Sequence, residues 1–383
     1  MNITANTSPQ GANKRTNGGH YRKRLLLMAS SFVFFFILLE LGYRRVDPYP
    51  YFAPREINRN EFGNLTEYDD HLGWRGTPNA ERVFVTQNAR VTLRHNAGGH
   101  RDVEEANRRK DLPAIVFLGD SFTWGYDVEY DDMFVNHVRA ANPENEIYNF
   151  GHRGYGTDQA LMIFERNAPQ RPLQRVFLMF YENDLADNTQ TIRYKKNKPR
   201  FLIQNDALTL TNAPVPVNRQ AWATASATVA KPTPTLKTRT RQLLFHSHLL
   251  HALHHRFTQP DVTQDLSTLT PDDLPDDAWD VTRRLIFRIG ARAEQLGGKL
   301  CVLRIPSKSE ILTPDMYAQF NAELSAITQA AGIDYIDLRP HLEATPLRTY
   351  YRDGIHWTPH GHEIVAKVIQ AYLATETAST SLP

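Results

Sequence analysis

The sequence has a single cysteine, Cys301, among 383 residues. One cysteine excludes an internal disulfide and a metal site built from several thiolates. Cys301 lies inside the apolar run 300–305, so we expect a small buried side chain rather than a nucleophile. An excess of charge of one sign is also absent, because the formal net charge is only +2. The chain therefore lacks the basic footprint of nucleic-acid-binding proteins, and we expect no nucleic-acid partner.

Acidic residues are absent before Glu40, whereas basic residues stand at 14, 15 and 22–24. The long apolar run Leu25–Leu39 follows them. This charge bias places the amino end in the cytoplasm and the rest of the chain outside. No small-x-small cleavage site follows, so we expect an uncleaved anchor rather than a removed signal peptide, with Glu40 at the membrane interface. For a bacterial chain, this predicts a disordered cytoplasmic tail over 1–24, one inner-membrane anchor over 25–41 and a periplasmic catalytic domain.

Apolar runs alternate with amphipathic stretches from about residue 112 onward. The runs predict strands, and the amphipathic stretches predict helices between them. Such alternation favours an α/β domain with a parallel sheet covered by helices on both faces. We expect strands near 115–118, 146–150, 175–181, 299–306 and 334–338, with helices at 133–141, 159–166, 285–296, 316–331 and after Pro359.

Two further regions flank or interrupt this domain, which we place at 111–375 with a disordered tail over 376–383. Residues 42–110 are expected to form a linker and a small β-rich entry module, because runs at 81–85 and 90–94 alternate between apolar and polar side chains. An insertion at about 187–278 is expected to hold a hairpin near 199–217 and a mobile loop over 218–240.

Five histidines lie close together in the insertion, at 246, 248, 251, 254 and 255. His248, His251 and His255 share a helical face, which would suit a metal ion. No carboxylate or cysteine is interleaved, so a partly exposed helix is the favoured interpretation. We expect no metal and no cofactor.

Polar residues follow three of the predicted strands and precede the last helix. Gly119-Asp120-Ser121 follows the first strand, Gly154 lies in the loop after the second, and Asn183-Asp184 follows the third. Asp353 and His356 stand just before the helix that starts at Pro359. Because the carboxyl ends of parallel strands open onto one edge of a sheet, we expect these groups to meet there.

This set of groups suits acyl transfer, which needs a nucleophile, a base and donors for the oxyanion. Ser121 would attack the ester carbonyl. His356 would take the serine proton and return it to the leaving alcohol, while Asp353 fixes the imidazole tautomer. The backbone N–H groups of Ser121 and Gly154 and the side-chain amide of Asn183 would form the oxyanion hole.

The four blocks resemble those of SGNH (GDSL-type) hydrolases, over roughly 112–186 and 280–374. The resemblance implies a flavodoxin-like three-layer sandwich with strand order 2-1-3-4-5, and a Ser-His-Asp esterase mechanism without a metal. In that family the third block usually begins with glycine, whereas Tyr181 stands there in this chain. The bulk of Tyr181 beside Asn183 is expected to narrow the acyl pocket and favour acetyl groups. The anchor and the entry module also resemble membrane-tethered members found with bacterial exopolysaccharide machinery.

We therefore expect an esterase that removes O-acyl groups, chiefly acetyl, from a carbohydrate or polysaccharide. An O-acetyltransferase with the same triad and a membrane acyl-donor partner is the first alternative, a lipase is a weaker one, and a non-catalytic glycan-binding assembly protein is the last. Tryptophans at 74, 124 and 357 would either stack on sugar rings or pack in the core. The residues expected to contact substrate are Asp120, Trp124, Tyr181, Asp184 and Trp357.

Overall fold

The computed structural model describes residues 18–50, 52, 57, 65–220, 222, 246–258, 274–312, 317–351 and 354–380. Its centre is a five-stranded sheet in the order β13-β12-β7-β5-β6, and every neighbouring pair is parallel. Numbered along the chain within this sheet, the order is 2-1-3-4-5, as predicted. The strands are β5 (Ala114–Leu118), β6 (Glu146–Asn149), β7 (Leu173–Phe180), β12 (Lys299–Arg304) and β13 (Asp334–Asp337).

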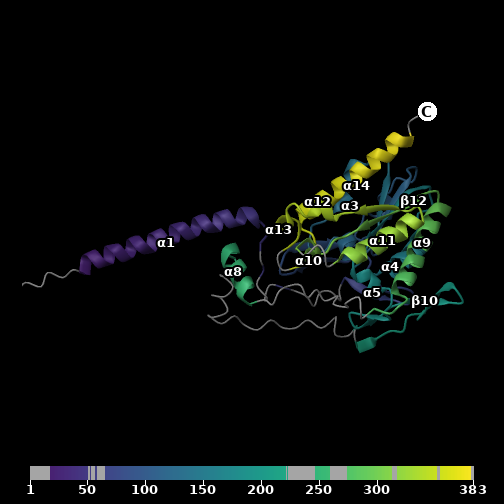
Figure 1. Ribbon diagram of the computed structural model, residues 1–383, viewed down its shortest axis with the longest axis horizontal. Helices are drawn as coiled ribbons and strands as arrows, with labels where there is room; N and C mark the ends of the chain where they lie inside the picture. Colours follow the sequence, from purple (N-terminus) through teal and green to yellow (C-terminus); the bar gives the residue numbers. More distant parts are fainter. Residues whose placement is uncertain are drawn as a thin grey trace, which may run out of the picture.

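Helices cover both faces of this sheet (Figure 1). One face carries α3 (Phe134–Ala141), α12 (Arg339–Leu342) and α14 (Pro359–Thr380). The other carries α4 (Thr157–Asn167), α9 (Ala278–Gln295) and α11 (Ala318–Ala330). Strand β5 serves both cores, because Ile115 and Phe117 point to the first face while Val116 and Leu118 point to the second. This explains why the β5 sequence is apolar without alternation.

The chain ahead of the sheet forms two antiparallel hairpins, one of which the alternating runs at 81–85 and 90–94 predicted. They pair β1 (Thr66–Asp69) with β2 (Gly73–Gly76), and β3 (Glu81–Val85) with β4 (Arg90–Arg94). A short 3₁₀ turn, η2 (Glu105–Asn107), leads into the sheet.

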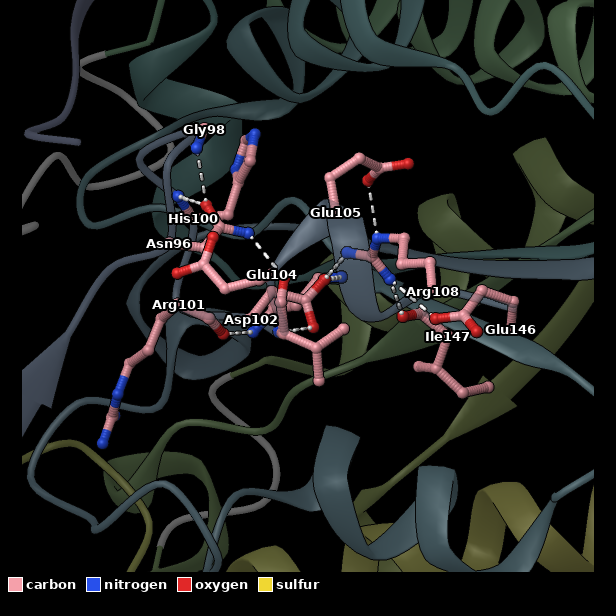
Figure 2. A network of polar contacts seen from close by, with 12 residues as sticks. Asn96, Gly98, His100, Arg101, Asp102, Glu104, Glu105, Arg108, Glu146 and Ile147 are labelled. Atoms are coloured by element: carbon pink, nitrogen blue, oxygen red, sulfur yellow. Dashed lines mark hydrogen bonds and ion pairs between the residues drawn. The ribbon is translucent and has the colours of Figure 1, made fainter. Parts of the chain in front are cut away.

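A buried ion network joins this lead-in segment to the edge strand β6 (Figure 2). The Arg108 guanidinium lies 2.6 Å from Asp102 and 2.9 Å from Glu146, and it donates to the carbonyl oxygen of Ile147 at 2.8 Å. Asp102 in turn accepts the backbone N–H of Asn149 at 2.9 Å. Backbone groups on the open side of β6 are thus paired by side chains, which is one way to protect a sheet edge from another chain.

The insertion contributes two further hairpins and a helix. They are β8 (Ile192–Arg193) with β9 (Lys196–Asn197), β10 (Arg200–Gln204) with β11 (Ala207–Thr211), and α8 (His248–Thr258). The predicted hairpin near 199–217 is therefore present. Most of the loop expected over 218–240 lies outside the described residues.

The first helix, α1 (Gly18–Val46), is longer than the predicted span of 25–41. It starts inside the tail that we expected to be disordered, because Tyr21, Arg22 and Lys23 continue the helix ahead of the apolar run. Residues 21–46 are long enough and apolar enough to cross a membrane, and a signal sequence has the same properties. At the other end α14 runs to Thr380, so the tail predicted over 376–383 is helical up to that residue.

The remaining short helices are α2 (Ser121–Trp124), α5 (Asn183–Asp187), α10 (Lys308–Leu312) and α13 (Pro346–Thr349). Two of them begin at the carboxyl ends of strands, α2 after β5 and α5 after β7. The helix α3 begins at Phe134 after an extended Met133, with no side-chain cap, so neither Asp131 nor Asp132 caps it.

Candidate active site

Ser121 is the first residue of α2, directly after β5. The turn requires Gly119, which adopts a φ of +147°; a Cβ there would lie 2.5 Å from the Thr123 hydroxyl oxygen. The buried Asp120 caps α2 by accepting the backbone N–H of Phe122 at 2.9 Å. This places the Ser121 hydroxyl at the carboxyl edge of the sheet, where open α/β sheets hold their sites.

His356 reaches the same point from the far end of the chain. Its Nε2 lies 2.7 Å from Oγ of Ser121, a hydrogen-bond distance across 235 residues of sequence. The imidazole is stacked on Tyr126, with ring centroids 4.3 Å apart and an interplanar angle of 22°, and it also contacts Phe122 at 5.1 Å. Burial and the nearby positive charge of Arg153 lower the pKa of His356 to about 3. The ring is therefore neutral at physiological pH, as a proton acceptor must be.

The backbone around His356 is held by the segment before it. The N–H of Tyr351 donates to the carbonyl oxygen of His356 at 3.2 Å, and Tyr350 forms an isolated β-bridge with Trp357. Asp353, the predicted partner of the imidazole, lies outside the described residues.

Gly154 lies in the loop after β6. Its φ is +71°, and a Cβ there would lie 2.3 Å from the ring of Tyr194. Glycine is therefore needed for both conformation and space. This loop is tied to the turn that carries Ser121, because the N–H of His152 donates to the carbonyl oxygen of Gly119 at 3.1 Å.

Asn183 opens α5 after β7. Its Nδ2 donates to Oδ2 of Asp187, one helical turn later, at 2.7 Å. Asp187 is itself held by Arg193 from the insertion, at 3.2 Å. The second N–H of the Asn183 amide is not used in that bond, which leaves a donor for a ligand.

Four buried carboxylates lie behind these groups: Asp120, Asp158, Asp184 and Asp187. Burial, with the charge of Asp187, raises the pKa of Asp120 to about 7, although the hydrogen bond from Phe122 opposes the shift. Burial and the charges of Asp120 and Asp187 raise the pKa of Asp184 well above its ordinary value. Asp158 forms a fully buried ion pair with Lys198 of the insertion. The insertion is thus packed against α4, which follows Gly154, and against α5, which begins at Asn183.

Among the residues predicted to contact substrate, the two tryptophans are buried instead. Trp124 and Trp357 are both 0 % exposed. Trp124 donates its Nε1–H to Nε2 of His95 at 3.1 Å. Trp357 packs on Phe122, with ring centroids 4.8 Å apart. Both rings therefore pack in the core, the second of the two predicted roles, and neither is exposed to a sugar in this structure. Trp74 is likewise buried and donates to the carbonyl oxygen of Arg153 at 3.1 Å.

The other predicted contacts are buried too, but they lie against the site. Tyr181 is 2 % exposed. Its ring packs on that of Phe122, the residue directly after Ser121, with ring centroids 5.0 Å apart. Asp184 accepts the Thr157 hydroxyl at 3.2 Å, and Asp120 caps α2 as described. All three side chains are buried next to residues that flank Ser121 or Asn183.

The structure adds residues that the sequence did not single out. Tyr126 covers the imidazole, Tyr194 covers Gly154, and Asp187 holds the Asn183 amide. The contact between Asp187 and Asn183 could have been predicted, because two side chains four residues apart meet when the segment is helical. Tyr126 and Tyr194 carried no such signal, because loop conformation alone brings their rings to the site.

Within the described part of the chain, no group of three or more His, Cys, Asp or Glu side chains is arranged to hold a metal ion. His248 in particular donates from Nδ1 to the carbonyl oxygen of Asp47 at 2.7 Å. The Ser121 hydroxyl and the neutral imidazole of His356 lie at hydrogen-bond distance, and acyl transfer requires such a nucleophile and base.

The chain matches one protein family and is similar to several solved structures. Residues 117–364 match the sequence model of the GDSL-like lipase/acylhydrolase family. No curated protein sequence matches the chain. Among solved structures, a lipolytic G-D-S-L family protein from Veillonella parvula is similar at 16 % identity, covering 71 % of this chain and 100 % of its own, with a TM-score of 0.37. A lipase/acylhydrolase from Enterococcus faecalis is similar at 14 % identity, covering 69 % and 97 %, also with a TM-score of 0.37.

Proposed function

Because the chain belongs to the GDSL-like lipase/acylhydrolase family, a family of ester hydrolases, we propose that it is a serine esterase that removes O-acetyl groups from a carbohydrate or polysaccharide. The observation that carries the proposal is the 2.7 Å distance between Oγ of Ser121 and Nε2 of His356. At this distance a serine hydroxyl can pass its proton to the imidazole as it attacks a carbonyl carbon.

In the proposed mechanism, Ser121 Oγ bonds to the ester carbonyl carbon while Nε2 of His356 takes its proton. The imidazolium then gives that proton to the departing alcohol, which leaves an acyl-Ser121 intermediate. Water, deprotonated by His356, then attacks the acyl carbon; its bond to Ser121 Oγ breaks, the imidazolium returns the proton to Oγ, and the acid is released. Asp353, three residues before His356, would accept the Nδ1–H and hold the tautomer that receives a proton at Nε2.

The developing oxyanion would be stabilised by three donors: the backbone N–H groups of Ser121 and Gly154, and Nδ2 of Asn183. Glycine at 154 is required by its φ of +71° and by the Tyr194 ring, and together they fix the backbone that carries this N–H. The hydrogen bond from Asn183 to Asp187 supports this role, because it fixes the amide before substrate arrives. A donor fixed in advance costs no reorganisation during the reaction.

Preference for a short acyl chain rests on Tyr181. Its ring packs on Phe122, directly beside the nucleophile, where the usual family residue is glycine. A ring in that place leaves less room for an acyl chain. The test is a panel of acetyl, butyryl and octanoyl esters, together with acetylated sugars and polysaccharides. Turnover should be highest on acetyl esters. A turnover of octanoyl esters equal to or above that of acetyl esters would contradict the proposed preference.

The compartment is part of the same proposal. The apolar stretch of α1 and the basic residues ahead of it support a single-pass inner-membrane anchor with the catalytic domain in the periplasm. Resistance of the full chain to carbonate extraction, with protease access to the catalytic domain from the periplasmic side only, is the expected result. Release of a shortened chain lacking α1 into the soluble fraction would instead identify a cleaved signal sequence.

An O-acetyltransferase using the same acyl-enzyme is the second candidate. It is favoured by a contact between the linker after α1 and the segment that holds His356: the rings of Tyr49 and Tyr351 lie 5.2 Å apart. A site close to the anchor suits an acyl donor that is itself a membrane protein. Incubation with an acetylated donor and a glycan acceptor separates the two reactions, since a hydrolase releases only free acetate and a transferase acetylates the glycan.

A further inference from the structure

Glu40 interrupts the apolar part of α1 near its carboxyl end. A hydrocarbon core about 30 Å thick takes about 20 helical residues. Counted back from Glu40, that length ends near Tyr21 and the basic residues 22–24. If those basic side chains lie at the inner surface of the membrane, Glu40 comes to the outer surface. The level of Glu40 therefore marks where the membrane ends.

At this level Glu40 binds the first turn of α8. Its Oε1 accepts the backbone N–H of His248 at 2.9 Å, and its Oε2 accepts that of Leu249 at 2.9 Å and the Ser247 hydroxyl at 2.8 Å. Arg44, one turn further along α1, donates to the carbonyl oxygen of His246 at 3.1 Å. An ionised carboxylate at the edge of the hydrocarbon is costly unless it is paired, and the start of α8 supplies those partners.

Over residues 248–253 of α8, the exposure of the side chains is opposite to that of a helix on a soluble domain. The polar residues His248 and His251 in this part are buried, each 5 % exposed. Its apolar residue Leu253 is 44 % exposed, and Leu249 lies one turn before it on the same side. Figure 1 shows α8 beside the carboxyl end of α1 and running across the direction of α1. A helix in that position lies in the plane of a membrane that α1 spans.

We propose that α8 is an interfacial helix that lies on the outer surface of the same bilayer, with its leucine face in the lipid. The occupant of this face is thus lipid, not a second protein. The inference rests on the membrane anchor of the proposed function and is independent of the esterase chemistry. Short amphipathic helices bind membranes by burying such a face at the headgroup boundary.

The consequence concerns the orientation of the catalytic edge. His248 binds the carbonyl oxygen of Asp47, and two residues later Tyr49 packs on Tyr351. Tyr351 donates to the backbone of His356. A helix that spans the membrane and a helix on its surface, rather than one flexible tether, would then hold the side of the domain that carries Ser121 and His356 near the bilayer.

The test uses the buried position of Cys301, which is 0 % exposed and should not react in the folded chain. Full-length protein with Leu253→Cys is labelled with an environment-sensitive fluorophore and inserted into phosphatidylethanolamine/phosphatidylglycerol vesicles containing a nitroxide lipid labelled near its headgroup. Unlabelled wild type gives the background. The matched control is Glu144→Cys, because Glu144 is exposed just before β6, at the sheet edge opposite Ser121.

The label at 253 should shift to shorter wavelength and be quenched several-fold more than the label at 144. Adding Glu40→Ala should reduce the quenching at 253, since it removes the acceptor that holds α8. Equal quenching at 253 and 144, in protein that still resists carbonate extraction, would overturn the proposal and point to another occupant. Extraction of the protein by carbonate would overturn the anchor itself, while ester turnover by the same sample reports separately on the proposed function.

Discussion

Asp187 holds the amide of Asn183 from one helical turn away, with Oδ2 accepting Nδ2–H at 2.7 Å. The bond fixes which way the amide points and leaves one N–H for a ligand. Asp187 is therefore a positioning residue in the proposed mechanism, and it acts through Asn183 without touching substrate.

Asp187→Ala should lower kcat by about 10- to 100-fold with little change in KM. Removing an oxyanion donor altogether costs about 100- to 1,000-fold in kcat, whereas this substitution keeps the Asn183 amide and only removes the bond that orients it. Steady-state kinetics on an acetyl ester provide the measurement. Asp187→Asn keeps an acceptor at the same place and should recover most of the rate. A rise in KM at constant kcat, or an Asn variant as slow as the Ala variant, would show that Asp187 does not act through the amide.

Tyr126 stacks on the imidazole of His356, and Tyr126→Leu should remove that support. Aromatic pairs contribute about 0.5–1.5 kcal/mol beyond their buried area, so kcat should fall by up to about tenfold. Tyr126→Phe keeps the ring and is the matched control. A Leu variant with wild-type kcat would show that the rest of the loop alone orients His356.

The acid limb of the pH profile should lie below the ordinary histidine pKa of about 6.5. His356 must be neutral to accept the serine proton. Burial and Arg153 lower its pKa, so it stays neutral as the pH falls past 6.5 and activity is lost only at lower pH. The measurement is kcat/KM from pH 4 to pH 9 with a substrate that does not ionise in this range. An acid limb centred at or above 6.5 would contradict the burial of this ring in the working enzyme.

Arg108→Met should destabilise the fold by about 3 kcal/mol, because breaking a buried ion pair leaves an uncompensated charge. Asp102 keeps Arg139 as a second partner, whereas Glu146 loses its closest guanidinium. Urea unfolding of the full chain in detergent gives the free energy. Arg82→Met, at an exposed position on β3, should change it by no more than about 0.5 kcal/mol. Equal effects of the two substitutions would mean that the network of Figure 2 contributes nothing.

The sheet was predictable from the sequence because its signal is local. The run 115–118 is apolar on every residue and too short for a helix, which favours a strand buried on both faces, and the structure places it inside the sheet between β7 and β6. The pairing of Ser121 with His356 was also predictable, since both stand at the ends of elements that a parallel sheet brings to one edge.

Contacts that depend on loop conformation were beyond the sequence. Such contacts depend on the relative placement of separate segments, which no periodicity in the sequence encodes. Examples are the burial of Trp124 and Trp357, the stacking of Tyr126 on His356, and the packing of α8 on Glu40. Glu40 is instructive here. From the sequence alone, Glu40 is an unfavourable charge at the end of an apolar helix. The structure shows that it accepts hydrogen bonds from the start of α8, about 200 residues later in the chain.

The most direct measurement of the central claim is mass spectrometry of the full-length protein after brief incubation with an activated acetyl ester, combined with its steady-state turnover. The account predicts an acetyl group on Ser121 of the wild type, and a fall in turnover of several orders of magnitude with no acylation in Ser121→Ala. Acylation at another residue, or an alanine variant that keeps wild-type turnover, would contradict it.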